Sequence, residues 1–463
     1  MSLCAILSGR ALPSTFDSAT SAQEDPSIAM DSLGNYVVVY TDYDSGSSSK
    51  GVFAQRYQSN GTAIGTALSV NTTTTGDQYD PEVAMDHVGN FVVVWTDHSG
   101  FDYDVYARRF DTNGVPLGDA YQVNSEPLLT AVQHQPDVAM DAVGNYTIVY
   151  WVEYALTLID LIAYKRYSAT GTETDGGLAT SREGASNPEI ALDDNNNGYL
   201  VWRHSSLLDA GNIMMKPIST FGDATTGESI VNTTQSHTQS HASVSISGDG
   251  SQLAVAWQSG HDTGSGQDGS AWGVYTKAYN LSAGTDSGEQ RVNDFTLGAQ
   301  SEPSVAMNDQ GSYVVTFTDY NGDKTGIVQP DVYVQEYLPT GIGTGPNALL
   351  NSTTSGNQTS PAVVMNNAGQ YATVWATSSA TDPGSIEVDN LLFGGGSLPV
   401  TMGDFVAACQ PEGVLLKWQT LTEHHNSGFE VQRSKDGSTW ATIDWVEGRG
   451  DTYEPTTYQY LDR

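Results

Sequence analysis

The stretch from residue 81 to residue 95 reads Pro-Glu-Val-Ala-Met-Asp-His-Val-Gly-Asn-Phe-Val-Val-Val-Trp. It opens with a short apolar run, passes through Asp86 and Gly89, and ends in β-branched and aromatic residues. Asp and Gly are typical of tight turns, whereas β-branched and aromatic residues favour strands. The stretch therefore predicts a β-hairpin that ends at Trp95.

The same text recurs along the chain. The residues that correspond to Pro81, called anchors below, are Pro26, Pro81, Pro136, Pro188, Ala242, Pro303 and Pro361. Fourteen positions after the anchor stands an aromatic residue in six copies: Tyr40, Trp95, Tyr150, Trp202, Phe317 and Trp375. In the fifth copy Trp257 is displaced by one position, and in the fourth Asn196 replaces the turn glycine. Self-similarity at a fixed period predicts a repeat architecture.

Each copy continues with two further predicted strands. A third strand such as Val105 to Phe110 is followed by a short one that ends in Val-Asn, as at Val123-Asn124. Four strands in roughly 56 residues is the content of one propeller blade. The seventh copy has only three, but residues 13–26 align without a gap on residues 68–81. We therefore expect an all-β, seven-bladed β-propeller of four-stranded blades over residues 1–396, closed by the N-terminal strand.

Residues that recur in every copy are expected to serve the architecture. The aromatic column predicts packing between neighbouring blades, with a ring of sugar-stacking platforms as the alternative. A glutamine three residues before six anchors, such as Gln78, predicts a tie between the blade connection and backbone groups. The basic residues in third strands and the acids that end second strands predict cross-strand or cross-blade ion pairs. In five copies a methionine stands four residues before the glycine of the hairpin turn, and we expect these side chains to fill the core.

The charge and the cysteines narrow the function classes. Acidic residues outnumber basic ones 54 to 18, for a net charge of −36, which disfavours nucleic acid and anionic lipid as partners. No apolar run approaches the length of a membrane span. Cys4 and Cys409 provide neither a disulfide framework nor a metal-ligand spacing, and we see no intact signal peptide.

Few residues point to chemistry. Asp319, Asn321 and Asp323 place oxygen ligands at alternate positions, which predicts a calcium loop or, as the alternative, a plain polar turn. His237 and His241 have a metal-like spacing, but in a polar loop rather than a helix. Asp436-Gly437 lies in a single segment similar to the Asp-box of sialidases, which a hairpin turn also explains. No nucleophile elbow or phosphate loop is present, and acidic pairs are too common to single one out.

The repeat text resembles repeats of large secreted and surface proteins of bacteria, and this resemblance implies a propeller in an extracellular setting. Residues 397–463, with the segments 414–418 and 428–431, resemble the fibronectin-type-III-like module of Bacteroidetes-type secreted proteins. About five strands are expected there, which is short of a complete immunoglobulin-like sandwich. An apolar face that includes Val414, Leu416, Trp418, Phe429 and Val431 would then lack its closing strands.

These observations predict a non-enzymatic, extracellular or cell-surface adhesion or scaffold protein that binds glycan or protein partners through propeller loops. One alternative is a structural subunit of an extracellular filament, completed by strand exchange through the C-terminal module. The other is a polysaccharide-degrading enzyme, a lyase or glycosidase, on a propeller scaffold. The ligand itself is not predicted.

Overall fold

The computed structural model describes residues 14–15, 22–43, 49–100, 102–124, 131–154, 159–180, 184–206, 209–220, 227–260, 266–320, 329–351, 356–379, 384–392, 400–410, 413–434, 440–452 and 456–462. The chain divides into two compact units. One is Pro13–Asp389, and the other contains Asn390–Arg463. No helix in the described ranges has the length and apolarity needed to span a bilayer.

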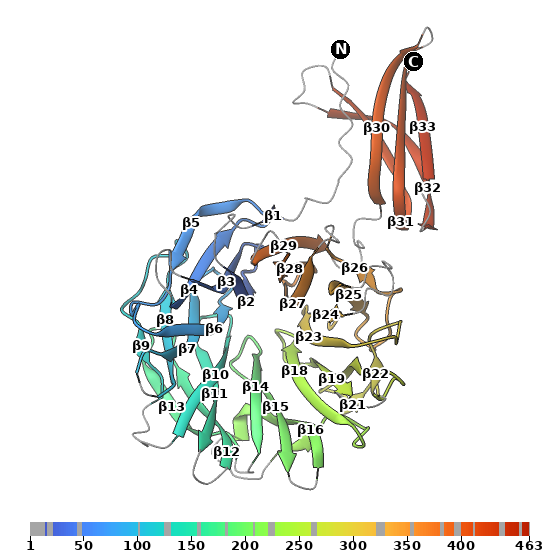
Figure 1. The fold of residues 1–463 in the computed structure, drawn as a ribbon. Coiled ribbons are helices and arrows are strands. Elements are labelled where there is room, and N and C mark those ends of the chain that lie inside the picture. Colours follow the sequence, from blue (N-terminus) through green and yellow to red (C-terminus); the bar gives the residue numbers. More distant parts are fainter. Residues whose placement is uncertain are drawn as a thin grey trace. The chain divides into compact units, whose positions relative to one another are not determined.

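The described residues of the first unit form seven antiparallel sheets, which follow one another around a ring (Figure 1). We number them in chain order. Sheets one to three contain β2 (Gln23–Met30), β3 (Tyr36–Tyr43), β4 (Lys50–Tyr57) and β5 (Ala63–Ser69); β6 (Asp77–Met85), β7 (Phe91–His98), β8 (Asp104–Phe110) and β9 (Tyr121–Gln122); and β10 (Ala131–Met140), β11 (Tyr146–Tyr154), β12 (Ile159–Tyr167) and β13 (Glu173–Leu178).

Sheets four to seven complete the ring. They contain β14 (Ala185–Leu192), β15 (Gly198–Ser206), β16 (Asp209–Pro217) and β17 (Ser229–Ile230); β18 (Thr238–Ile246), β19 (Gln252–Gly260), β20 (Trp272–Asn280), β21 (Thr285–Asp286) and β22 (Gln290–Arg291); β23 (Gln300–Met307), β24 (Tyr313–Asp319), β25 (Asp331–Tyr337) and β26 (Ala348–Leu349); and β27 (Asn357–Met365), β28 (Gln370–Ser378), β29 (Ser385–Leu392) and β1 (Ser14–Thr15). A 3-10 turn, η1 (Ile218–Thr220), follows β16. The innermost strand of each sheet contacts those of the two neighbouring sheets, from β2 through β27 and back to β2. This is the arrangement of a β-propeller.

The predicted hairpin turn has the same construction in several sheets. Asp86 Oδ1 accepts hydrogen bonds from the backbone N–H groups of Val88 and Asn90 at 3.0 and 2.8 Å, and its Oδ2 accepts one from Asn90 Nδ2 at 2.7 Å. Asp31, Asp141 and Asp193 make the corresponding bonds. Gly89 has a φ of 97°, and Asn196 reaches 63°, which confirms that it takes the place of the turn glycine.

Every innermost strand carries a β-bulge at its anchor. In sheet two the register shifts between Tyr79 and Glu82, so that Asp80 and Pro81 lie opposite the single residue Trp95. Proline has no N–H for the ladder, and a bulge removes the need for one. The residue before each anchor has a φ between 47° and 56°: Asp25, Asp80, Gln135, Asn187, His241, Glu302 and Ser360. The ring thus repeats a left-handed residue once per sheet.

The aromatic column packs between neighbouring sheets, as predicted. Trp95 is 1% exposed and lies in one cluster with Val37, Val39 and Val52 of sheet one. The other members of the column are at most 4% exposed, which excludes them as platforms for sugars. Trp257 is displaced because its hairpin turn is one residue longer, with Ser247 N donating to Gln252 O. The extra residue restores Trp257 to its place opposite the bulge.

The recurring glutamine does tie the connections between sheets. Gln78 is fully buried, and its Nε2 donates to the carbonyls of Thr75 and Gly76. Its Oε1 accepts from Nδ2 of Asn71, whose own Oδ1 accepts from Val52 N at 2.9 Å. The Val-Asn terminus of one sheet is therefore linked through this glutamine to the start of the next.

The N-terminal strand closes the ring, as its alignment predicts. In β1, Ser14 pairs with Val388 and Thr15 pairs with Glu387 of β29. Gln23 Oε1 accepts from Ile386 N at 3.2 Å, the bond that Asn71 accepts in sheet one. Sheet seven is thus built from both ends of the first unit.

The third-strand cations mostly do not form the predicted ion pairs. Arg56 donates to the carbonyls of Thr112 and Asn113 in the next sheet, and Arg109 donates to those of Ala169 and Thr170. Carbonyls are the better partners here because each tight turn directs them toward the preceding sheet. Ion pairs within a sheet do occur at Lys165–Glu173 and Lys277–Asp286.

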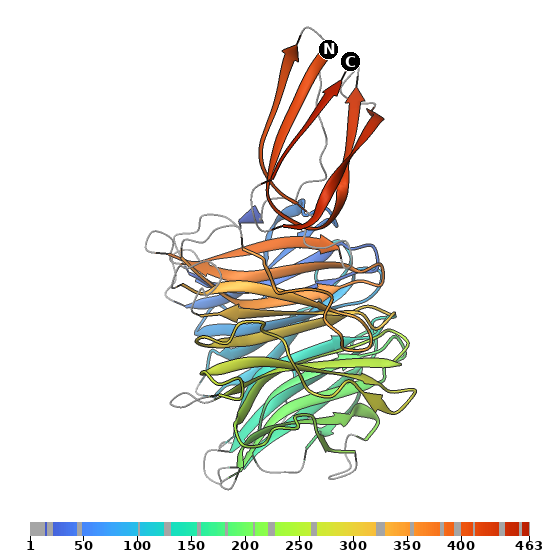
Figure 2. The ribbon, with the colours of Figure 1, turned by 90° about the vertical axis from the view of Figure 1, so that its right-hand side faces the viewer.

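The second unit has four strands in its described residues, where about five were expected: β30 (Val400–Gln410), β31 (Gly413–Ser434), β32 (Trp440–Thr452) and β33 (Thr456–Asp462). They are the red strands of Figure 2. The expected open apolar face is wrong, because Leu416, Trp418, Phe429 and Val431 are at most 5% exposed. The long β31 bends so that its two halves pack together, with the rings of Trp418 and Phe429 5.3 Å apart.

Candidate functional site

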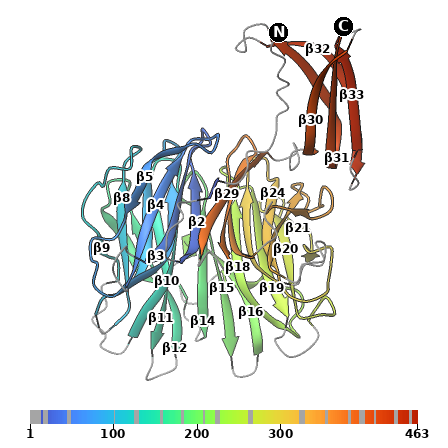
Figure 3. The ribbon, with the colours of Figure 1, turned by 45° about the horizontal axis from the view of Figure 1, so that its top comes forward.

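The innermost strands enclose a cavity of about 430 Å³ on the axis of the ring. Figure 3 shows three of these strands, β2, β14 and β18, on the inner side of the ring. All seven sheets line the cavity, each with its bulge: Asp25, Pro26, Asp80, Pro81, Glu82, Gln135, Pro136, Asn187, Pro188, Glu189, His241, Ala242, Ser243, Glu302, Pro303, Ser304, Ser360, Pro361 and Ala362. The bulge directs the side chain of the left-handed residue toward the axis, and this residue differs from sheet to sheet.

The acidic side of this axial cavity lies on sheets one and two. Burial, and after it the nearby Asp25 carboxyl group, raise the pKa of Asp80 to about 7, although Lys50 opposes the shift. The pKa of Asp25 is raised as well, by burial first and then by Glu24. Asp80 therefore exchanges its proton near neutral pH, the property required of a general acid or base.

Two glutamates add to this acidity one step along their strands. Glu82 and Glu189 directly follow their anchors, and burial together with Asp137 raises both pKa values well above normal. Sheets five and six have Ser243 and Ser304 there, each of which accepts a hydrogen bond from a backbone N–H of the next sheet at 3.2 Å.

The opposite side of the cavity holds a fixed carboxylate beside a histidine. Glu302 Oε1 accepts from Tyr320 Oη at 2.6 Å, and Oε2 accepts from Thr318 Oγ1 at 2.8 Å and Ser360 N at 2.9 Å. Burial lowers the pKa of His241, which Glu302 partly offsets. Three donors leave the Glu302 carboxylate little freedom to rotate, so it is positioned before any ligand arrives.

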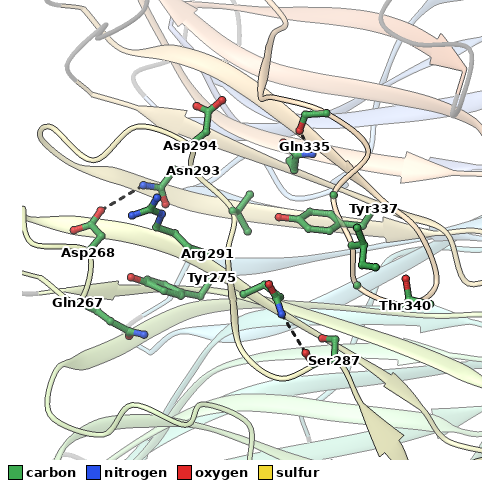
Figure 4. A pocket seen from close by; sticks show the side chains of 16 residues that line it. Gln267, Asp268, Tyr275, Ser287, Arg291, Asn293, Asp294, Gln335, Tyr337 and Thr340 are labelled. Atoms are coloured by element: carbon green, nitrogen blue, oxygen red, sulfur yellow. Dashed lines mark hydrogen bonds between the residues drawn. The ribbon is translucent and has the colours of Figure 1, made fainter. Parts of the chain in front are cut away.

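A second cavity, of about 830 Å³, lies between sheets five and six (Figure 4). Tyr275, Arg291 and Asp268 line one side, while Tyr337 and Gln335 line the other. Its tyrosines belong to the recurring aromatic pairs between second and third strands. We attribute this outer cavity to a missing side chain, because Ala278 stands where sheets one to three have the arginines that reach the next sheet.

The turn that such an arginine would reach is still present in sheet six. Gly341 in that turn corresponds to Gly114. A Cβ placed on Gly341 would meet Ser287 Cβ at 2.5 Å and Ala278 Cβ at 3.7 Å, whereas one on Gly114 would meet Arg56 Cδ at 3.0 Å. Ser287 therefore takes part of the space that an arginine occupies in sheet one, and the shortened side chain at Ala278 accounts for the rest.

The metal candidates from the sequence are not assembled by the described residues. Asp319 is fully buried, and its Oδ1 accepts from Gln300 Nε2 at 3.0 Å, while Asn321 and Asp323 lie outside the described residues. His241 lines the axial cavity, but His237 bonds Ser236 instead. In the described part of the chain, no three His, Cys, Asp or Glu side chains are grouped closely enough to hold an ion. The Asp-box-like segment at Asp436 also lies outside the described residues.

Sequence reasoning missed the axial acids because it treated acidic pairs as uninformative. A signal was available: the position before the anchor is Asp, Asp, Gln, Asn, His, Glu and Ser in turn, although a proline follows it in six copies and a glutamine stands two positions before it in six. A side chain that varies from copy to copy between recurring residues is one that the architecture does not determine.

Comparison with known proteins relates the chain to propeller structures. No family model matches the sequence, and no curated protein matches it. A protein of unknown function from Dyadobacter fermentans is 10% identical, with a TM-score of 0.49 over 83% of this chain and 98% of that one. A Hadza microbial sialidase is 10% identical (TM-score 0.48, 81% and 66% covered), and a polysaccharide lyase is 11% identical (TM-score 0.48, 77% and 88% covered). Such identities relate folds alone.

The expectation of a non-catalytic adhesion or scaffold protein is corrected by these comparisons. The similar structures are mostly enzymes, including the sialidase, the lyase, an arabinanase and a family-43 glycoside hydrolase. They agree better with the alternative of a polysaccharide-degrading enzyme on a propeller. The adhesion hypothesis arose because repeated residues dominate the sequence pattern, and those residues build the scaffold in catalytic and non-catalytic propellers alike.

Proposed function

We propose that this protein is an extracellular enzyme that hydrolyses glycosidic bonds of a polysaccharide in the axial cavity. The observation that carries the proposal is Asp80, a partly buried carboxyl group whose pKa is raised to about 7 in a cavity. A carboxyl that keeps its proton at neutral pH can protonate the leaving oxygen of a glycosidic bond.

Glu302 is the proposed partner of Asp80. Three sheets separate it from Asp80 in one direction around the ring and two in the other, so it lies on the far side of the axial cavity. In the proposed reaction Asp80 donates its proton to the glycosidic oxygen as the bond to the anomeric carbon breaks. A water molecule attacks that carbon and passes a proton to the Glu302 carboxylate. Asp80 thus acts as the general acid and Glu302 as the general base.

The charge of the cavity favours a neutral or cationic glycan over a uronate polymer. Glu302 lines it beside four carboxyl groups whose raised pKa values favour the neutral form, and the chain as a whole carries −36. Like charges repel, so a polyanionic substrate would have to overcome this field. The physical argument thus selects a glycosidase over a lyase, which acts on acidic sugars.

The test compares Asp80→Asn with Asp119→Asn, which changes an exposed aspartate far from the cavity. Both are assayed for reducing ends and for unsaturated products on soluble arabinan, xylan, mixed-linkage β-glucan and alginate. We expect the parent to release reducing ends from a neutral polymer, and Asp80→Asn to lose on the order of 100-fold or more of this activity. Full activity in Asp80→Asn, or activity on alginate alone with unsaturated products, would refute the proposal.

We further propose that the seven sheets are the complete set of blades and that the second unit is a fibronectin-type-III-like module. The repeat period and the resemblance of residues 397–463 support these assignments. Calcium is proposed as a stabilising ion on the basis of the acidic loops, including Asp319. Because a ligand of the native state stabilises it by mass action, a melting temperature unchanged by a chelator would remove calcium from the proposal.

A further inference from the structure

Five aromatic and imidazole rings gather on sheets two and three, and two of them directly precede residues that line the axial cavity. We call Tyr79, His98, Tyr103, His134 and Trp151 the rim rings. Tyr79 and His134 directly precede Asp80 and Gln135, which line the cavity. Trp151 is paired with His134 across β10 and β11, while His98 and Tyr103 flank the connection between β7 and β8.

The rim rings form a continuous row. His98 stacks on Tyr103 with centroids 4.1 Å apart and planes 5° apart, and Tyr79 meets Tyr103 edge-on at 6.5 Å. Tyr103 is 6.4 Å from His134, which lies 4.4 Å from Trp151. All five are partly exposed, unlike the buried aromatic column. Burial lowers the pKa of His134, and Glu153, which lies 3.5 Å from its Nε2, partly offsets this shift.

The architecture of the ring does not require these side chains. The position of Tyr79 and His134 is occupied in the other five sheets by Glu24, Ser186, Ser240, Ser301 and Thr359. The position of Trp151 holds Thr41, Thr96, Arg203, Gln258, Thr318 and Ala376 in the other six. Since those sheets form the same hairpin and the same bulge with small or polar residues, the rings on sheets two and three have another use.

We propose that the rim rings bind consecutive sugars of a neutral polysaccharide whose bond is cleaved in the axial cavity. Each sugar ring has a face of C–H groups that packs on an aromatic surface, while its hydroxyls bond the polar edges of tyrosine and histidine. The occupant is chosen by continuity, because the rings begin at the residue next to Asp80. This inference rests on the proposed function. It places the sugars next to the cleaved bond of the polysaccharide over sheets two and three.

The experiment uses Trp151→Ala, Tyr103→Ala and the double variant, with Trp151→Phe to restore a ring. Tyr43→Ala is the matched control, because Tyr43 is an exposed aromatic residue at the sheet-one position that corresponds to His98. Binding to arabinan, xylan and mixed-linkage β-glucan is measured by affinity electrophoresis in an Asp80→Asn background. The KM for the polymer and kcat for an aryl glycoside are measured with Asp80 present.

We expect each alanine variant to weaken polymer binding and to raise the polymer KM roughly tenfold, which corresponds to about 1.4 kcal/mol of lost binding free energy. The rate on the short glycoside stays unchanged, Trp151→Phe regains most of the binding, and Tyr43→Ala behaves as the parent. A double variant that binds all three polymers as the parent does, or equal losses on polymer and aryl glycoside, would overturn the inference. Binding that is lost with Trp151 while Asp80→Asn keeps full activity would support the rim rings and reject the catalytic proposal.

Discussion

The two ends of the innermost strands differ in how far the fold determines their side chains. At the turn end, Asp86 and its counterparts Asp31, Asp141 and Asp193 accept the same set of hydrogen bonds in each sheet. At the bulge end the backbone is equally regular, with a left-handed residue in every sheet, but the side chain of that residue varies around the ring. Repetition therefore identifies the residues that the fold requires, and variation within a repeated backbone identifies those that the fold leaves free for chemistry.

The largest expected effect separates two tryptophans. Trp95→Ala should lower the free energy of unfolding by about 3–5 kcal/mol, because Trp95 is 1% exposed and its removal leaves a cavity between sheets one and two. Trp151→Ala should cost less than Trp95→Ala, because its ring is partly exposed although it packs against the cluster between sheets three and four. Urea denaturation measures both. Equal losses in the free energy of unfolding would show that Trp151 contributes to the core as much as Trp95 does.

The next effect concerns the repeated turn. Asp86→Ala removes the acceptor for two backbone N–H groups and for Asn90 Nδ2, and Asp86 is 3% exposed. Losing three hydrogen bonds to a buried carboxylate should destabilise the protein by about 2–3 kcal/mol. Asp86→Asn should keep part of this stability, because its amide oxygen still accepts hydrogen bonds. A melting temperature unchanged by Asp86→Ala would contradict the structural role assigned to the turn.

Asp80 should behave in the opposite way to Asp86. Its pKa is about 7 in the folded protein against about 4 in the unfolded chain, so between these values only the folded state keeps the proton. Stability attributable to Asp80 is then lost as pH rises from 4 to 7. Asp80→Asn should stabilise the protein at pH 8 by roughly 1–2 kcal/mol and change little at pH 4.

Thermal melts of the parent and Asp80→Asn between pH 4 and pH 8 measure this difference. A variant that is less stable than the parent at pH 8 would show that the charged carboxylate is supported by the fold, and Asp80 would lose its place as the strained, functional acid.

The smallest effect tests the outer cavity. Ala278→Arg should let a guanidinium reach the turn that contains Gly341, as Arg56 reaches Thr112 and Asn113. We expect a gain of about 0.5–1 kcal/mol from the new hydrogen bonds. Ala278→Lys, which lacks the planar fork, is the control and should gain less. Destabilisation by Ala278→Arg would show that the space between sheets five and six has a use of its own.

The sequence was sufficient to predict the ring of sheets but not the site at its centre. The period, Asn196 as a glycine substitute, the buried aromatic column and the closing strand all follow from local patterns that one blade shares with the next. The axial site does not, because Asp80 and Glu302 are 222 positions apart and are brought to one cavity only by closure of the ring. The ion pairs expected of Arg56 and Arg109 failed for a related reason: a sequence shows charges but not the direction of turn carbonyls.

The closing strand sets an order of events during synthesis. Ser14 leaves the ribosome early, and its partner Val388 is made 374 residues later. At about 5–20 residues per second, the N-terminal segment waits roughly 20–75 seconds for its sheet. Until then sheet one has no neighbour on one side, and each newly made sheet in turn presents an unpacked face. The nascent chain therefore remains an incomplete ring throughout this interval, which makes the time before β29 emerges the period when chaperones would matter most.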